Sequence, residues 1–284
     1  MSLENFIPEV WSARLLANLS KVQVYTAPAV INSDYEGEIS GVGDSVRINA
    51  IGRVTVSDYS KNTDIAAPVA LQDGQTILSI NKAKYFNFQI DDIDKAQQKP
   101  KVMDSAMAEA AYALRDAADH IVAAQYTDVP AANLIGTDGS PKTGYTTANI
   151  YEFLVDAGAI LDDNNVPSEG RWAIVPPWFH GYLLKDARFV GYGTQAQIET
   201  LQNGRVGRAA NFDIYKSNNV PNTTATKYKI ICGHPVAWTF AQQLLEMNAY
   251  RPEKRFADAV KGLHVYGTKV VRPEALAVIT ANKT

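Results

Sequence analysis

Hydrophobic and polar residues alternate along two neighbouring stretches in the first third of the chain. In the first stretch the apolar positions are Val46, Ile48 and Ala50. This alternation predicts a strand over 43–51 with one apolar and one solvated face. A return strand is predicted over 69–80, with a turn signal at Asp73-Gly74, and the mostly polar stretch 54–64 forms the tip. Because a two-stranded ribbon is only marginally stable alone in water and the nearby sequence offers a single helix to cover it, we expect this hairpin to pack on other copies of the chain.

That single helix follows a second alternating stretch. Over 82–92, Phe86, Phe88 and Ile90 face one way, which predicts a half-buried strand. After Pro100, apolar residues recur at spacings of four and three and predict a helix over 101–126, about 40 Å long. Its apolar stripe consists of Met103, Met107, Ala110, Leu114, Ala117, Ile121 and Ala124. A coiled coil is the alternative, but alanine at many seam positions favours packing on a sheet.

A mixed α/β region is predicted from Pro130 to about Trp238. A helix over 147–161 would carry Tyr151, Leu154, Val155 and Ala159 on one side, a buried strand follows over 171–177, and another helix begins at 178–184. The glycine-rich segment 189–208 is predicted to be a loop. Further strands are predicted over 236–245, 262–271 and 275–280, and the N-terminal stretch combines a short amphipathic piece over 6–16 with an extended segment over 22–31.

Composition limits the class of protein. The chain has 284 residues, of which 46% are hydrophobic and 20% charged, so it can bury a core. No run approaches the roughly 18 apolar residues of a membrane helix, and the N-terminus lacks a secretory signal, so we expect a cytosolic product. The formal net charge of -3 disfavours direct binding of nucleic acid.

The residues that carry chemistry in other proteins do not form a familiar site here. The single cysteine, Cys232, excludes an internal disulfide and a thiolate metal cage, and the four histidines have no metal-ligand spacing. The acidic stretch 91–94 lacks the spacing of a calcium loop. GRVGR at 204–208 lacks the preceding strand and the lysine of a phosphate-binding loop. We therefore expect no catalytic site, no metal and no cofactor.

Several segments, taken in order, carry a family resemblance. They are FIPEVW at 6–11, GDSV at 43–46, YFNFQIDDID at 85–94, GRVG at 204–207, FDIY at 212–215, SNNVP at 217–221 and GLHVYGTKVVRP at 262–273. With these segments the chain resembles the major capsid (coat) proteins of tailed bacteriophages, whose shell fold is shared by encapsulin compartments and herpesvirus capsid floors. The resemblance covers nearly the whole chain.

The resemblance implies an α+β fold, the tailed-phage major capsid fold, in four parts. Residues 1–37 would be the N-terminal arm and 38–80 the extended β-hairpin loop. The peripheral domain, with its long spine helix, would comprise 81–130 and 240–270, and the axial domain 131–239 and 271–284. Members of the family build hexamers and pentamers with the axial domains at the symmetry axis, while loops and arms lie over neighbouring subunits.

Subunit contacts are expected at the arm, the extended loop and the glycine-rich segment. The residues assigned to them are Phe6, Trp11, Val46, Ile48, Val54, Val56, Tyr59, Lys61, Tyr192, Gln195, Gln202 and Arg205. Some members of the family crosslink a loop lysine to a neighbour. Lys61 lies where such a lysine would be, but nothing in the sequence identifies its partner, so a crosslink is not expected.

The function implied is that of a structural subunit, not an enzyme, which assembles in the host cytoplasm into the icosahedral or prolate capsid of a virion around double-stranded DNA. The acidic balance suits such a container, because a strongly basic wall would hold the DNA. Implied partners are other copies of the chain, a separate scaffolding protein (since the chain begins directly with the arm), a portal and decoration proteins, with no membrane. An encapsulin-like compartment subunit and an unrecognised enzyme remain as alternatives.

Overall fold

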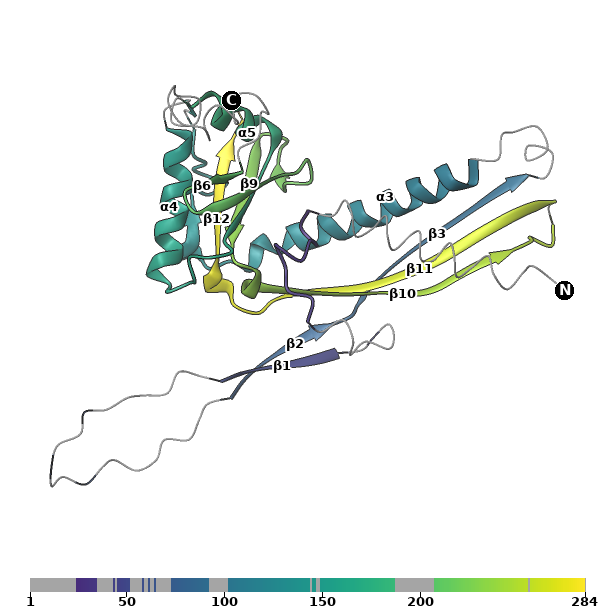
Figure 1. The fold of residues 1–284 in the computed structure, drawn as a ribbon, viewed down its shortest axis with the longest axis horizontal. Coiled ribbons are helices and arrows are strands. Elements are labelled where there is room, and N and C mark those ends of the chain that lie inside the picture. Colours follow the sequence, from purple (N-terminus) through teal and green to yellow (C-terminus); the bar gives the residue numbers. More distant parts are fainter. Residues whose placement is uncertain are drawn as a thin grey trace.

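The computed structural model describes residues 24–34, 43, 45–51, 58, 61, 64, 73–91, 102–143, 145–146, 149–186, 207–254 and 256–283. Figure 1 shows an elongated three-stranded sheet that carries one long helix. A seven-stranded sheet with its own helices lies at one end of the elongated sheet, and a hairpin projects below both. In the described part of the chain, no helix is both long and apolar enough to span a lipid bilayer.

The elements follow one another in a mixed α+β order, as predicted. The helices are α3 (Val102–Ala123), α4 (Ile150–Asp163) and α5 (Pro177–Lys185), with short 3-10 turns at η3 (Ala124–Asp128), η4 (Ala131–Asn133), η5 (Pro235–Ala237) and η6 (Pro273–Ala275). The strands are β1 (Ser45–Ile51), β2 (Asp73–Ser79), β3 (Lys82–Asp91), β4 (Leu134–Ile135), β5 (Trp172–Val175), β6 (Arg208–Ala209), β7 (Phe212–Lys216), β8 (Asn222–Thr223), β9 (Lys227–Gly233), β10 (Trp238–Tyr250), β11 (Ala257–Val270) and β12 (Leu276–Asn282).

The elongated sheet is antiparallel in the order β10-β11-β3, and α3 packs along it. Met107, Ala111 and Leu114 of the helix form a cluster with Val260, against which Phe86 and Phe88 pack. The predicted strand at 82–92, its apolar face and the packing of the helix on a sheet are confirmed.

The second half of the predicted helix stripe is only partly confirmed, although Ile121 does pack against the large core. Ile121 is only half-buried and Ala124 is exposed, whereas Ala118, Val122 and Ala123 are fully buried. The reason is a change of partner along α3: its C-terminal half packs into a larger core that the seven-stranded sheet shares with β10 and β11. A single stripe read at constant spacing cannot follow two differently placed partners.

The seven-stranded sheet has the order β4-β12-β9-β5-β7-β6, with β8 beside β9, and α4 packs against β12. Of the four residues predicted to share one side of α4, Leu154 is buried, whereas Val155 and Ala159 are exposed. The other buried positions in this part of the helix are Ala157, Gly158 and Leu161. Gly158 has the ring of Phe212 close to where a Cβ would stand (3.6 Å), so the helix meets the sheet closely there.

One core joins the two sheets. The rings of Trp172 in β5 and Trp238 in β10 stack at 5.1 Å with an interplanar angle of 10°, and Trp238 Nε1 donates to the carbonyl oxygen of Val30 at 2.8 Å. Asn32 forms a parallel bridge to Thr239 of β10. The segment 24–31 consists of turns rather than the predicted extended chain, because the Val30 and Ile31 amides fold back onto the carbonyl of Ala27.

The hairpin β1–β2 is antiparallel, with Ile51 opposite Asp73. The predicted turn at Asp73-Gly74 is wrong, since Gly74 pairs with Ala50 inside the ladder. The apolar face of the hairpin, formed by Val46, Ile48, Leu78 and Ile80, packs on Ala241 and Val265 of β10 and β11. The base of the hairpin is therefore covered by the chain's own sheet and not, as expected, by another copy.

Candidate assembly surfaces

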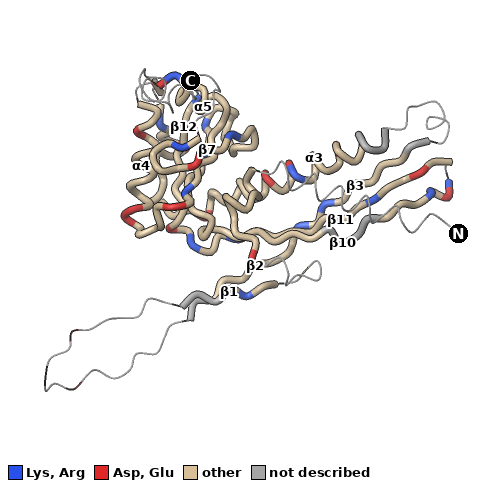
Figure 2. The backbone as a smooth tube through the Cα atoms, in the orientation of Figure 1, with Lys and Arg blue, Asp and Glu red and all other residues tan. Residues whose placement is uncertain are grey.

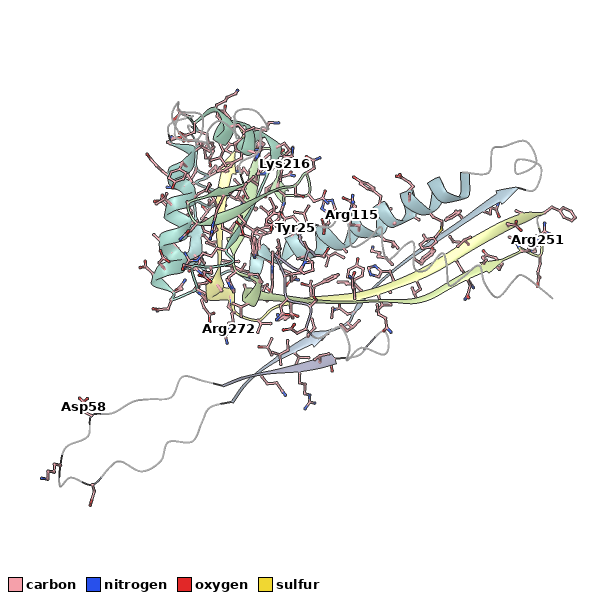
Figure 3. All side chains as sticks on the ribbon, viewed as in Figure 1. Tyr25, Asp58, Arg115, Lys216, Arg251 and Arg272 are labelled. Atoms are coloured by element: carbon pink, nitrogen blue, oxygen red, sulfur yellow. The ribbon has the colours of Figure 1, made fainter. Side chains whose placement is uncertain are left out.

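Most of the residues predicted to form subunit contacts lie outside the described residues. These are Phe6, Trp11, Val54, Val56, Tyr59, Tyr192, Gln195, Gln202 and Arg205. The structure places Val46 and Ile48 in the chain's own core, with 5% and 6% of their surface exposed, which leaves little side-chain area for a neighbour. Lys61 is exposed, and so is Asp58, which Figure 3 labels far from both sheets.

Large apolar side chains instead lie exposed on the projecting elements. Phe256, between the ends of β10 and β11, is 85% exposed, and Tyr85 on β3 is 78% exposed. Tyr112 on α3 and Ile77 on β2 are exposed as well. The sequence analysis missed these residues, although a lone phenylalanine within the charged stretch 251–258 was a signal for Phe256. Burial of such side chains by another molecule would be favourable.

A polar groove of about 330 Å³ lies where the hairpin meets the sheet. Ile77, Lys82 and Ile121 are among its lining residues, and so are Lys269 and Asp128, whose Nζ and Oδ2 atoms are 3.7 Å apart. Among the described strands, β3 forms one edge of the elongated sheet, and Lys82 and Lys84 are exposed on it. Lysines on an edge strand oppose unwanted pairing with other strands.

The N-terminal segment is held on α3 by the carboxylate of Asp119. The backbone N–H of Val24 donates to Oδ2 at 3.3 Å, and the Thr26 N–H and hydroxyl donate to Oδ1 at 3.4 and 3.1 Å. Burial raises the pKa of Asp119 despite these hydrogen bonds, and Tyr25 beside it is fully buried. The described N-terminal segment is thus fixed to α3 of the same chain.

Two ion pairs fix the loops of the seven-stranded sheet. Lys229 Nζ donates to Asp138 and, at 3.2 Å, to the hydroxyl of Thr280, and the hydrogen bond from Lys229 lowers the pKa of Asp138. The buried Arg171 donates to Oδ1 of Asp162 at 2.7 Å and to carbonyl oxygens of the chain that follows α4. Both pairs position loops within one subunit.

Burial holds the side chains of Cys232 and His264 in their neutral forms at neutral pH. Burial raises the pKa of the Cys232 thiol to about 12, so it stays protonated and is not a nucleophile. Burial also lowers the pKa of His264 to about 4. Within the described ranges, no three His, Cys, Asp or Glu side chains are placed to hold a metal ion.

Comparison with known proteins shows similarity to phage capsid proteins. A family model described as phage capsid protein matches residues 73–279. The fold is similar to that of a chain from Mycobacterium phage Che8, at 27% identity over 91% of each chain with a TM-score of 0.74. It is also similar to the capsid of Cyanophage P-SCSP1u, at 20% identity over 87% of this chain and 85% of the other with a TM-score of 0.69.

A virus-like particle from Pyrococcus furiosus shares the fold as well. The identity is 15% over 98% of this chain and 100% of the other, with a TM-score of 0.59. At that identity the likeness concerns the fold alone. Among curated proteins, none matches.

Proposed function

The chain belongs to the phage capsid protein family, and on this premise we propose that it is the major subunit of an icosahedral or prolate shell that is built from hexamers and pentamers and encloses double-stranded phage DNA. The observation that carries the proposal is the exposure of Phe256 and Tyr85 on the elongated sheet. An isolated subunit gains nothing from presenting these rings to water, whereas a lattice of copies would bury them.

We assign the elongated sheet and α3 to a peripheral domain of residues 81–130 and 240–270, and the seven-stranded sheet to an axial domain of residues 131–239 and 271–284. The division of the strands between the two sheets supports this assignment. The arm (1–37) and the extended loop (38–80) would then lie over neighbouring subunits. The interface residues predicted from the sequence, including Lys61, belong to this proposal.

The glycine-rich segment 189–208 is proposed to approach the ring axis, where rings of five and six demand slightly different backbone shapes. Gly191, Gly193 and Gly204 would allow this at low steric cost. An assembled structure tests the placement, because the segment must contact adjacent subunits around the axis. A position at the outer rim of the ring would refute it.

We propose the further partners that a structural role in a virion implies, namely a scaffolding protein, a portal and decoration proteins. Assembly would take place in the host cytoplasm, and the chain would have no enzymatic activity. The net charge of -3 supports a wall that encloses DNA without gripping it.

Electron microscopy of the protein purified from producing cells tests the proposal. We expect closed shells with hexameric and pentameric units, and nuclease-resistant DNA in shells isolated from infected cells. A protein that stays monomeric, alone and in the infected cell, would contradict the proposal. Shells filled with a protein cargo and no DNA would favour the encapsulin-like alternative.

A further inference from the structure

Strand β3 forms a long edge of the elongated sheet. Among the strands that the structure describes, it pairs only with β11, and it does so from Lys82 to Asp91. A row of N–H and C=O groups on the other side of such a strand is a template for a further strand. The positions of β3 that alternate with the α3-facing residue Phe86 are exposed as well. They are Ala83, Tyr85, Asn87 and Gln89.

The charges of β3 are divided between its two ends. The strand begins with Lys82 and Lys84, both exposed (Figure 2), and it ends at Asp91. Between Lys84 and Asp91 its sequence contains no charged residue. Two copies of β3 side by side in parallel would set lysine against lysine, which is unfavourable. In the antiparallel direction, the basic end of each strand lies beside the acidic end of the other.

An antiparallel pairing also matches the faces of the two copies. Residues directly opposite each other in such a pair lie on the same face of the sheet. When Asn87 of one copy lies opposite Asn87 of the other, Tyr85 of each copy lies opposite Gln89. Both α3 helices then lie on one face of a continuous sheet. Tyr85, which is 78% exposed in the single subunit, gains a cross-strand neighbour.

We infer that β3 pairs antiparallel with β3 of a second copy, so that the elongated sheets of two subunits become one sheet. The contact is isologous, because both copies use the same surface about a two-fold axis. Main-chain hydrogen bonds would hold the two strands together, and the charges at their ends would set their direction. The inference rests on the proposed shell, and it names one surface through which its subunits meet.

A cysteine at position 87 tests the pairing. Directly opposite residues of an antiparallel pair have Cβ atoms about 4.5–5.5 Å apart, so mild oxidation of shells made of the Asn87→Cys variant should give disulfide-linked dimers on a non-reducing gel. The single natural cysteine, Cys232, is fully buried and does not interfere. The substitution removes one exposed hydrogen bond, from the Tyr250 hydroxyl, and circular dichroism establishes that the variant is folded.

Asn248→Cys is the matched control. Asn248 is exposed on β10, and it lies in the same cross-strand row as Asn87 because both residues pair with Lys261 of β11. The control therefore places a cysteine on the same face of the same sheet, one strand beyond β11 on the other side. We expect about tenfold more dimer from Asn87→Cys, because a disulfide does not form between distant positions.

The outcomes separate the contact from the proposed function. Equal dimer yields from the two cysteine variants overturn the pairing, and so does the absence of dimer from Asn87→Cys in shells that assemble normally. Both results leave the capsid function intact. If the unmodified protein does not assemble at all, the proposed function itself fails.

Exchange of the end charges tests the direction of the pairing. In the Asn87→Cys background, Lys84→Glu places an acid beside the acidic end of the partner strand and should lower the dimer yield about fivefold. Adding Asp91→Lys exchanges the two ends and should restore the yield, whereas no recovery would overturn the antiparallel alignment. An amine-reactive crosslinker that joins Lys84 only to Lys61 of another chain would show that a loop covers this edge instead, which would also overturn the inference.

Discussion

A Cβ atom added to Gly267 would lie 2.5 Å from the carbonyl oxygen of Ser79 and 2.9 Å from Cδ1 of Ile80. The end of β2 thus crosses β11 so closely that only glycine, which has no Cβ atom, fits at position 267. This crossing fixes where the projecting hairpin leaves the elongated sheet, and therefore the direction in which it extends.

Gly267→Ala should weaken the subunit. The methyl group forces the backbone of Ser79 away from β11, and overpacking of this kind costs about 1–3 kcal/mol. Thermal unfolding should give a lower melting temperature. Gly181→Ala is the control: a Cβ at this position in α5 meets nothing within 4 Å, and alanine favours a helix, so its melting temperature should not fall. Equal melting temperatures for the two variants would contradict the role of the crossing.

Helices and strands that pack against a single surface along their length could be predicted from the sequence. The alternation of Phe86 and Phe88 gave β3 its correct face, and the spacing of Met107 and Leu114 gave α3 its contact with the sheet. The predictions failed where the partner changes or lies far along the chain. Val155 belongs to a regular apolar spacing, yet the core selects another face of α4, and Ala124 continues the apolar stripe of α3 but is exposed.

The candidate surfaces were harder to predict for a related reason. Val46 and Ile48 alternate like residues of an interface, but their partners, Ala241 and Val265, follow nearly 200 residues later, so the pattern could not separate burial by the same chain from burial by a neighbour.

Leu114 should be essential for the packing of α3 on the elongated sheet. Leu114→Asp buries an unpaired charge among Met107, Val260 and the aromatic rings of β3, at a cost of several kcal/mol. We expect insoluble protein or a much lower melting temperature. Ala113→Asp places the same charge on an exposed position of the same helix and should be tolerated. The assigned face of α3 would be wrong if both variants melted like the original protein.

His264 should make the subunit less stable in acid. Its pKa is lowered by burial from 6.5 to about 4, so the unfolded chain takes up a proton at a pH where the folded chain does not. Stability is therefore complete above about pH 6.5 and is lost as the pH falls towards 4, by about 2 kcal/mol between pH 7 and pH 5. Urea unfolding at both pH values measures the loss. His264→Gln should remove most of it, and an unchanged pH dependence in that variant would refute the assignment.

Asp119 should hold the base of the N-terminal arm. Asp119→Ala leaves the amides of Val24 and Thr26 without their acceptor, a cost of about 1–3 kcal/mol. Chymotrypsin should then cleave faster after Tyr25, which is fully buried in the intact subunit. Asp119→Asn keeps an acceptor oxygen and should be cleaved more slowly than the alanine variant. Equal cleavage rates in all three proteins would show that other contacts hold the segment.

The extended loop should be required for assembly but not for folding of the subunit. Deleting 45–70 would also remove Val46 and Ile48 from the core, so a narrower deletion separates the two roles. Ile51 and Asp73 lie opposite each other in the ladder, and an Asn-Gly turn can join strands at such a position.

Replacing 52–72 with this turn keeps the base of the hairpin, so we expect a melting temperature close to that of the intact subunit. Closed shells should be absent in electron micrographs, because the part of the loop proposed to reach a neighbour is gone. Shells of normal size from this variant would show that the contacts of the described body are sufficient for assembly.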